Sequence, residues 1–230
     1  MDDRFAIDAL ARCPLFEHAD EHILASLANR LRRRRFRRNE VIFHQGDPGD
    51  SLHVVAAGSV KIVLPSHEGD EAIIATLRPG DFFGELALLD GAARSATAAA
   101  LDASETLVLP RPVFIELLDT LPGLRDALLY GLAYELRRLT GHVEELHFLD
   151  LAGRLAMRLS RLARESQPDG HGEIRLDWPY TQSDLAAMIG GTRQSVNKLL
   201  SQLVDEGLIR IEPDFLIIAD LEELAKRADR

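Results

Sequence analysis

Residues 82–98, FFGELALLDGAARSATA, bring together groups that suit an anionic ligand. Gly84 has no side chain, so the backbone there can approach a ligand closely. Glu85 can accept a hydrogen bond from a hydroxyl, Ser95 adds a hydroxyl, and Arg94 offers a planar fork of donors that matches a phosphate. The stretch predicts a pocket for a small phosphorylated ligand.

The apolar run 86–89 within this stretch is long enough for one helical turn. The backbone amides of Leu86 and Ala87 would then open the turn without intrahelical partners, which makes them donors to an anion. A different interpretation stays open on this pattern alone, namely that Glu85 and Arg94 form a surface ion pair on a barrel.

Short strands separated by turns surround this stretch, from about Arg37 to Pro110. The turn sequences GDPGDS, SHEGDE and RPGD are rich in Gly, Pro, Asp and Ser, and they predict an antiparallel barrel or roll. The predicted strands are 40–45, 51–58, 59–66, 71–77, 96–101 and 105–110, preceded by helix over 5–30.

Residues 111–148 are predicted to be helical, with apolar residues spaced alternately three and four apart. That spacing keeps an apolar seam on one side of a helix, as a two-stranded coiled coil requires. A helix packed on its own roll also shows an apolar stripe, so this alternative stays open, although the strict heptad favours a dimer. The predicted interface residues are Leu129, Leu132, Leu136, Leu139, Val143 and Leu146.

The C-terminal part has the pattern of a DNA-reading module. Asp150 is expected to cap a new helix, and a polar connector spans 167–180. Over 181–218 we expect helix, turn, helix and two short strands. Thr181 with Asp184 forms a capping-box pattern, and Thr192 is a suitable cap for the second helix. The glycine pair 190–191 allows the sharp turn that joins such helices.

Charge and composition narrow the function further. The chain has 27 Lys and Arg against 37 Asp and Glu, so contact with a nucleic acid requires a local patch. Residues 185–204 contain no acid, which supplies such a patch. Cys13 is the only cysteine, no histidines have a metal-binding spacing, and we expect no metal site. No apolar run is long enough for a membrane span, and the start lacks a signal pattern, so we expect a cytoplasmic protein without membrane contact.

Two of these motifs resemble one known family. FGELALLDGAARSATA (83–98) is similar to the phosphate-binding cassette of cyclic-nucleotide-binding domains. TQSDLAAMIGGTRQSVNKLLSQLVDEGLI (181–209) is similar to the helix-turn-helix of the cyclic-AMP receptor protein (CRP/FNR) family of bacterial transcription regulators. The motifs occur in the family's order, and the resemblance covers about residues 10–220. It implies that Glu85 contacts a ribose 2′-hydroxyl while Arg94 and Ser95 hold a cyclic phosphate.

The resemblance also implies a place for the base. Family members that bind cyclic AMP often present two adjacent hydroxyl-bearing residues to the adenine, one from each subunit's long helix. This sequence has Leu139 and Thr140 there, and only Thr140 keeps a hydroxyl. Cyclic AMP is the expected effector, while cyclic GMP, a dinucleotide and weak binding stay open.

In the DNA module, the resemblance implies that Arg193 reaches a guanine through O6 and N7. Gln194 stands where the family often has a glutamate that accepts from cytosine, so we expect a shifted or relaxed preference at that base pair. Lys198 completes the exposed face. Thr192, Ser195 and Asn197 are candidates for phosphate contacts.

Three features remain outside this scheme. The basic run RLRRRRFRR (30–38) is expected to be a solvated edge or an interaction face just before the first roll strand, although nucleic-acid binding is an alternative. His44 and His53 lie in predicted strands and are candidate haem ligands, but satisfied or exposed histidines are the commoner case. IRIEPDFLII (209–218) resembles the wing of a winged helix. No catalytic constellation is apparent, so we do not expect an enzyme.

Together these features predict an α+β chain with an antiparallel β-roll of the cyclic-nucleotide-binding type, a long dimerisation helix and a winged helix-turn-helix. The expected domains are 1–110, 111–149 and 150–230. We expect a homodimer that binds a palindromic double-stranded operator under nucleotide control and contacts RNA polymerase. One alternative is a family member that is constitutive or senses another ligand. Another is a cyclic-nucleotide-binding module that regulates a protein partner.

Overall fold

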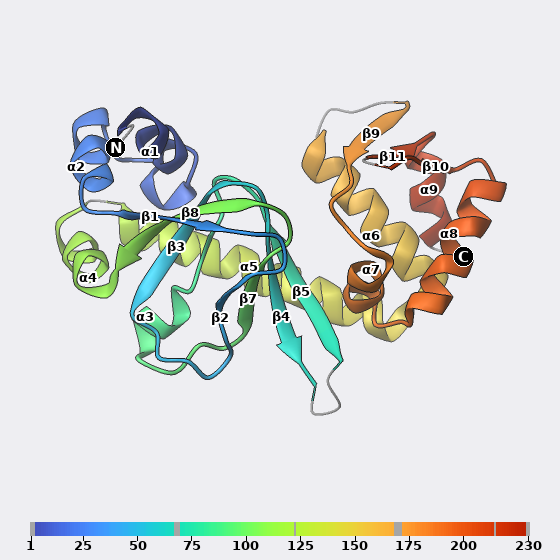
Figure 1. Ribbon diagram of the computed structural model, residues 1–230, viewed down its shortest axis with the longest axis horizontal. Helices are drawn as coiled ribbons and strands as arrows, with labels where there is room; N and C mark the ends of the chain where they lie inside the picture. The colour runs from blue at the N-terminus through green and yellow to red at the C-terminus, as the bar shows by residue number, and fades with distance from the viewer. Residues whose placement is uncertain (1–2, 67–69, 122, 168–171, 214, 229–230) are drawn as a thin grey trace. The chain divides into compact units, whose positions relative to one another are not determined.

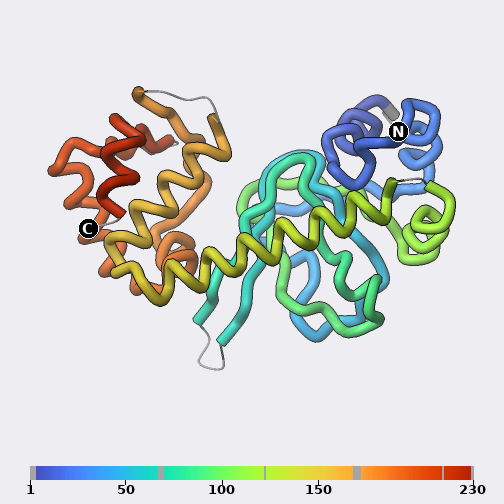
Figure 2. Tube along the Cα trace, turned by 180° about the vertical axis from the view of Figure 1, so that it is seen from behind, coloured from blue at the N-terminus to red at the C-terminus, as the bar shows by residue number. Residues whose placement is uncertain are grey.

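The computed structural model describes residues 3–66, 70–121, 123–167, 172–213 and 215–228. The chain forms two compact units, Met1–Arg137 and Arg138–Arg230, and each is described by itself (Figure 1). The boundary between the units falls within the longest helix, α5 (Leu124–Phe148), which Figure 2 shows as one continuous helix. The domain limits at 110 and 149 stay a prediction.

The described strands of the first unit form two four-stranded antiparallel sheets, in the orders β1-β8-β3-β6 and β2-β7-β4-β5. An α+β chain with an antiparallel roll is therefore confirmed. The strands are β1 (Arg32–Phe36), β2 (Val41–Phe43), β3 (Ser51–Ala57), β4 (Val60–Pro65), β5 (Glu71–Leu77), β6 (Phe82–Phe83), β7 (Thr97–Ala100) and β8 (Ser104–Pro110). The expected strand positions are right to within a few residues, and His44 lies just beyond the end of β2.

Two apolar clusters stabilise this unit. Alternate residues of β3 and β8, among them Leu52 and Leu107, pack against helices on one side of the first sheet. The opposite side contributes Val55 and Phe83 to a cluster inside the roll. The helices are α1 (Asp3–Ala11), the 3₁₀ turn η1 (Pro14–Phe16), α2 (Glu21–Ala28), α3 (Leu86–Asp90), α4 (Arg111–Thr120) and the first part of α5.

The predicted helix over 111–148 is wrong at one point, because it divides into α4 and α5. Leu121 ends α4 in an extended conformation, with φ −96° and ψ 109°. A residue before proline is pushed out of the helical region, and position 122 is proline. Gly123 then takes a φ of +83°, which favours glycine.

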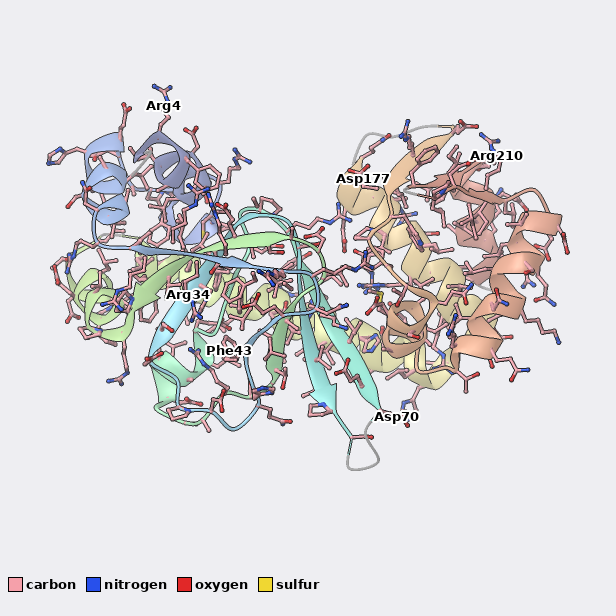
Figure 3. All side chains as sticks on the ribbon, in the orientation of Figure 1. Arg4, Arg34, Phe43, Asp70, Asp177 and Arg210 are labelled. Carbon is pink, nitrogen blue, oxygen red and sulfur yellow. The ribbon has the colours of Figure 1, made fainter. Side chains whose placement is uncertain are left out.

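The basic run lies at a largely exposed sheet edge, as expected, but its expected place before the first roll strand is wrong. Residues 32–36 form β1 itself, which is an edge strand paired with β8. Glu105 on β8 accepts hydrogen bonds from Arg33 and Arg35, and this carboxylate between two guanidinium groups lets consecutive arginines lie in one strand. The guanidinium carbon of Arg34, a residue labelled in Figure 3, lies 5.2 Å from the centroid of the Phe36 ring.

The second unit is a winged helix-turn-helix. Its sheet has the order β10-β11-β9, and its elements are α6 (Leu151–Ser166), β9 (Ile174–Asp177), α7 (Gln182–Ile189), α8 (Arg193–Asp205), β10 (Ile209–Ile211), β11 (Phe215–Ile218) and α9 (Leu221–Ala228). Asp150 caps α6 by accepting from the Gly153 amide at 2.7 Å, as predicted. The turn expected at Pro213–Asp214 includes residue 214, which lies outside the described residues.

The prediction that 167–180 is only a connector is wrong, because it contains β9. Ile174 and Leu176 are buried while Arg175 and Asp177 are exposed, which is the alternation of a half-buried strand. β9 pairs with β11 and completes the sheet. Two apolar residues were too short a signal beside the surrounding Gly and Pro.

Candidate functional site

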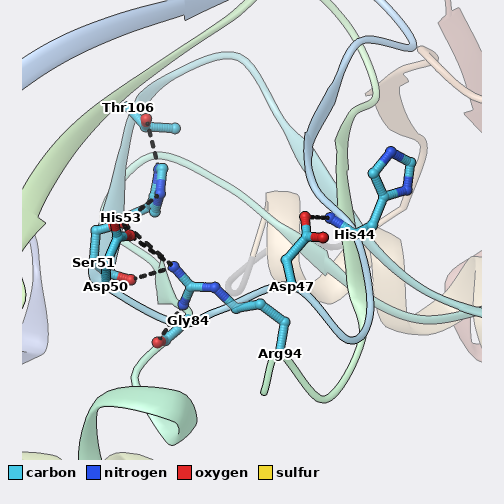
Figure 4. Close-up of polar contacts among 8 residues, drawn as sticks. All are labelled: His44, Asp47, Asp50, Ser51, His53, Gly84, Arg94 and Thr106. Carbon is cyan, nitrogen blue, oxygen red and sulfur yellow. Dashed lines mark hydrogen bonds and ion pairs between the residues drawn. The ribbon is translucent and has the colours of Figure 1, made fainter. Parts of the chain in front are cut away.

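The guanidinium of Arg94 is the centre of the polar cluster in the first unit (Figure 4). Its Nη1 donates to the Gly84 carbonyl oxygen at 2.7 Å, and its Nη2 donates to the Ser51 carbonyl oxygen, also at 2.7 Å. Arg94 is only 4% exposed. No hydrogen bond or ion pair joins it to Glu85 among the described residues, so the surface ion-pair interpretation does not describe this arginine.

Arg94 is a buried cation whose ion pair with Asp50 is long. The nearest carboxylate oxygen recorded with it belongs to Asp50, 3.9 Å from Nη2, on a side chain that is largely exposed. Burial lowers the pKa of Arg94, partly offset by the negative charges of Asp50, Glu85 and Asp47. Within the described part of the chain, its buried Nε has no acceptor. A buried arginine of this kind is suited to an anion supplied by a ligand.

Glycines let the backbone approach this arginine and the helix beside it. Gly84 has a φ of +85°, and a Cβ there would lie 2.6 Å from Nη1 of Arg94. A Cβ at Gly49 would lie 2.1 Å from the Cβ of Ala87, so the 46–50 turn packs directly on α3. The turn is also held by the Arg94 amide, which donates to the Asp47 carbonyl oxygen at 2.9 Å.

Helix α3 begins after Glu85, whose carbonyl oxygen accepts from the Leu88 and Leu89 amides at 2.9 and 3.1 Å. The amides of Leu86 and Ala87 therefore open the turn, as predicted from the sequence. Ala87 is buried, whereas Leu86 is exposed.

The pKa of the Glu85 carboxyl is raised. Burial is the main cause, and the negative charge of Glu135 on α5 adds to it, while the Glu85 backbone amide and Arg94 act in the opposite direction. Glu85 is half-buried and the Ser95 side chain is exposed. The structure thus places Gly84, Glu85 and Arg94 at one corner of the roll, with Ser95 next to them in the chain.

A cluster of three rings contacts Arg94 through Phe43. The Arg94 guanidinium carbon is 4.2 Å from the centroid of the Phe43 ring. His53 stacks on Phe83 with the ring centroids 5.0 Å apart, and Phe43 contacts both rings at 5.8 Å. His53 is buried and its Nδ1 lies 3.2 Å from Oγ1 of Thr106.

This histidine is in its neutral form near pH 7. Burial lowers the pKa of His53 to about 3, and the charges of Arg94 and Arg34 act in the same direction against a smaller opposing effect of Asp50. Its place among rings and hydroxyls marks it as a satisfied core residue. His44 is exposed, and its amide donates to Asp47 at 2.8 Å.

The helix-turn-helix of the second unit has the predicted caps. Thr181 and Asp184 form a reciprocal capping box at the start of α7. Gly190 ends α7 in the left-handed region, with a φ of +69°, and the Thr192 hydroxyl oxygen accepts from the Ser195 amide at 3.1 Å to begin α8. These local contacts define where α7 ends and where α8 begins.

One face of α8 carries the predicted DNA contacts. Arg193, Gln194, Asn197 and Lys198 are exposed on it, and the Ser195 hydroxyl lies 2.9 Å from that of Thr192. The Gln182 amide nitrogen at the start of α7 donates to Oδ1 of Asn197 at 2.9 Å. A positively charged, polar helix face of this kind fits the major groove of DNA.

Two family models match the chain. The model described as "Cyclic nucleotide-binding domain" matches residues 33–120, and the one described as "Crp-like helix-turn-helix domain" matches residues 153–227. A "CRP-like cAMP-activated global transcriptional regulator" of Mycobacterium tuberculosis is 32% identical over 221 residues, which are 96% of this chain and 99% of the relative. The chain belongs to the CRP/FNR family.

Two further proteins show the same relationship. The "Cyclic AMP receptor protein" of Thermus thermophilus is 34% identical over 216 residues, covering 92% of this chain and 96% of the relative. A solved CRP/FNR-family transcriptional regulator, also from Thermus thermophilus, is 31% identical, with a TM-score of 0.66 and coverage of 86% of this chain and 99% of that one. The CRP/FNR chain described here is therefore a cyclic-nucleotide-binding transcription regulator with a DNA-binding helix-turn-helix.

The predicted dimer stripe of this CRP/FNR chain has two kinds of residue. Leu129 and Leu136 are 64% and 67% exposed, and Val143 is also exposed. Leu132 is instead half-buried and packs against the core of its own unit, which is the alternative of a helix packed on its own roll. Leu139 and Leu146 are exposed as well. The interface itself stays a prediction.

In the second unit, the end of α5 packs against the helix-turn-helix. A Cβ on Gly191 would lie 2.8 Å from the Leu151 side chain, and one on Gly190 would lie 3.6 Å from Leu146. Nη1 of Arg154 donates to the Ile189 carbonyl oxygen at 2.7 Å. The glycine turn between α7 and α8 is therefore in contact with the end of α5 and the start of α6.

Sequence reasoning missed Ser51, Phe43 and the fixed position of His53 beside Arg94. The Ser51 carbonyl oxygen that binds Arg94 lies 43 residues earlier in the chain, and no sequence pattern indicates a backbone contact over that separation. Alternation along β3 would have placed His53 on the face that looks into the roll. Leu139 and Thr140 belong to the second unit, so their role in the pocket stays a prediction. The described residues contain no cluster of three possible metal ligands and no helix suited to crossing a membrane.

Proposed function

We propose that this CRP/FNR-family chain is a homodimeric regulator whose affinity for a palindromic DNA operator is controlled by a cyclic nucleotide bound in the β-roll. The observation that carries the proposal is Arg94, a buried guanidinium held by two carbonyl oxygens, with its Nε free of any acceptor in the described chain. A cyclic phosphate would supply a negative charge closer to the guanidinium than the long ion pair with Asp50.

The other groups around Arg94 fit the remaining parts of such a ligand. Glu85 would accept from the ribose 2′-hydroxyl, and Ser95 with the amides of Leu86 and Ala87 would donate to the phosphate. Gly84 keeps the backbone close. The names of two relatives, one "cAMP-activated" and one "Cyclic AMP receptor protein", make cyclic AMP the first nucleotide to test.

Thr140 is proposed to contact the base, with Leu139 in place of a second hydroxyl. A ligand that touches both the roll and the dimer helix shifts the DNA-binding population by its differential affinity for the two states. In the second unit, the reading face of α8 would contact DNA through Arg193, Gln194 and Lys198, with Thr192, Ser195 and Asn197 near phosphates. We further propose a cytoplasmic regulator that contacts RNA polymerase and is not an enzyme.

Calorimetry with the full-length protein tests the ligand. Arg94→Leu should abolish or greatly weaken cyclic AMP binding, because truncating one member of a buried charge pair costs about 2–5 kcal/mol. The matched control Arg37→Leu removes an exposed arginine of the same roll and should bind as the parent does. Equal affinity in the parent and the Arg94 variant would remove Arg94 from the site.

A second measurement tests control of DNA binding. The affinity for an operator selected from random DNA should rise when saturating cyclic AMP is added, and this rise should be lost in Arg94→Leu. Equal DNA affinity with and without nucleotide would support a family member that is constitutive or senses another ligand.

A further inference from the structure

The ring of Phe43 covers one face of the guanidinium that the proposed ligand site depends on. The Arg94 guanidinium carbon lies 4.2 Å from the ring centroid, which is the geometry of a cation–π contact. Phe43 comes from β2, whereas Arg94 follows α3 and precedes β7. The ring therefore reaches the arginine from a different strand.

Phe43 is itself held by two other rings. It contacts Phe83 and His53 with centroid distances of 5.8 Å in both cases, and those two rings stack on each other at 5.0 Å. Phe83 is buried within the apolar cluster inside the roll, and Phe43 packs against that cluster. The position of the Phe43 ring is therefore fixed by the core.

The edge of the guanidinium is fixed separately. Nη1 and Nη2 donate to the Gly84 and Ser51 carbonyl oxygens. With one face on Phe43 and both Nη groups hydrogen-bonded, the orientation of the plane is set before any ligand arrives. Two of the five N–H donors remain: one N–H of Nη1, and the Nε–H, which is buried and has no acceptor in the described residues.

We propose that Phe43 is a positioning residue for ligand binding: its ring holds the Arg94 guanidinium in a fixed plane, so that the N–H donors it keeps are ready for the anionic group of the ligand. This inference rests on the proposed function, since it assigns the ligand's anion to Arg94. A fixed arginine loses less conformational freedom on binding than a mobile one, which raises affinity without a contact between Phe43 and the ligand.

The variants separate this role from simple core filling. Phe43→Leu removes the ring, and Phe43→Tyr keeps an aromatic face against the guanidinium. Phe36→Leu is a matched control, because Phe36 is a buried ring of the same roll that faces a different arginine, Arg34. Phe43→Leu and Phe36→Leu should both lower thermal stability. Only Phe43→Leu should release the Arg94 guanidinium from its fixed orientation.

Two readouts on the full-length protein test the proposal. In calorimetry, Phe43→Leu should weaken cyclic AMP binding about two- to thirty-fold, with Phe43→Tyr restoring most of the loss and Phe36→Leu at the parental value. In proton–nitrogen NMR without ligand, the Arg94 Nε–H signal, assigned by its absence in Arg94→Lys, should exchange with water faster in Phe43→Leu alone.

Each outcome bears on one of the two proposals. If the parent binds cyclic AMP and Phe43→Leu binds it equally well, the positioning role is overturned while the proposed function stands. If the parent binds no cyclic nucleotide, the proposed function fails. In that case the exchange rate of the Nε–H still decides whether Phe43 orients Arg94, and an unchanged rate in Phe43→Leu overturns the inference.

Discussion

A Cβ on Gly84 would lie 2.6 Å from Nη1 of Arg94, the same nitrogen that donates to the Gly84 carbonyl oxygen at 2.7 Å. The glycine therefore both carries the acceptor and leaves room for the donor. Its φ of +85° adds a second requirement for glycine at this position. The backbone at Gly84 and the arginine at position 94 are one geometric unit.

This relationship predicts the effect of Gly84→Ala. The new methyl group must displace the guanidinium, so cyclic AMP binding should lose part of the about 2–5 kcal/mol that a buried charge contact carries. The left-handed backbone should also cost about 1–2 kcal/mol of unfolding free energy. Calorimetry and urea unfolding measure the two effects.

Gly91→Ala is the control for this substitution. Gly91 also has a positive φ, +74°, but a Cβ there meets no atom within 4 Å. It should show the backbone cost without the loss of ligand affinity. Equal ligand affinities in the two alanine variants would mean that Arg94 does not need its observed position to bind nucleotide.

The exposed part of the α5 stripe predicts the oligomeric state. Leu129→Glu and Leu136→Glu place charges on side chains that are mostly exposed in one chain, so the variants should fold but run as monomers in light scattering. Leu132→Glu should instead destabilise the unit itself, because Leu132 packs against its own core. Intact dimers of both exposed-site variants would show that the heptad is not the interface.

The buried His53 predicts a specific pH dependence of stability. Burial, with the charges of Arg94 and Arg34, lowers its pKa from 6.5 to about 3 in the folded chain. As the pH falls through 6.5, the unfolded chain takes up a proton that the folded chain does not. The stability that the neutral His53 contributes is therefore fully present above pH 6.5. As the pH falls from 6.5 toward 3, the free energy of unfolding decreases by about 1.4 kcal/mol per pH unit.

His53→Phe tests this assignment because it keeps a ring against Phe83 but cannot take up a proton. Urea unfolding at one fixed protein concentration, between pH 7 and pH 4, should show a shallower loss of stability in the variant. The slopes of unfolding free energy against pH should differ between the two proteins by about the amount expected for the uptake of one proton. Parallel curves for the two proteins would mean that His53 is protonated in the folded chain.

The parts predicted well from sequence are those that depend on near neighbours. The caps at Asp150, Thr181 and Thr192 involve residues three positions apart, so the sequence alone specifies them. β1 was missed because its arginines are stabilised by Glu105, about 70 residues away, and hydrophobic alternation does not reveal such a partner.

The site shows the same division. Arg94 and Gly84 were found because they share one motif, whereas the Ser51 carbonyl and the Phe43 ring come from other strands. The packed and exposed residues of the α5 stripe could not be separated from the sequence either, because Leu132 and Leu136 look alike in a heptad. Their difference depends on which side of the helix the roll occupies.

The exposed face of α8 predicts the operator. A two-fold dimer with one reading helix per subunit should select a palindrome whose half-sites lie about one helical turn, roughly 34 Å, apart. Arg193→Ala should reduce the free energy of operator binding by about 1–3 kcal/mol. The variant should also no longer require guanine at one base pair of each half-site. If Lys198 contacts a phosphate, Lys198→Ala should lower the affinity for all DNA sequences by the same factor. The affinity of this variant should also depend less steeply on salt concentration.

Gln194→Glu gives the sharpest test of which base α8 reads. A glutamine amide pairs with adenine, whereas a glutamate accepts from the N4 amine of cytosine. Selection from random DNA should therefore move the preferred base toward cytosine on the contacted strand, with the other positions unchanged. Arg193 lies next to Gln194 on the exposed face and serves as the internal control, since its guanine should persist in the selected sites. A selection that returned no palindrome, or the same palindrome for the parent and all three variants, would show that α8 does not read the operator.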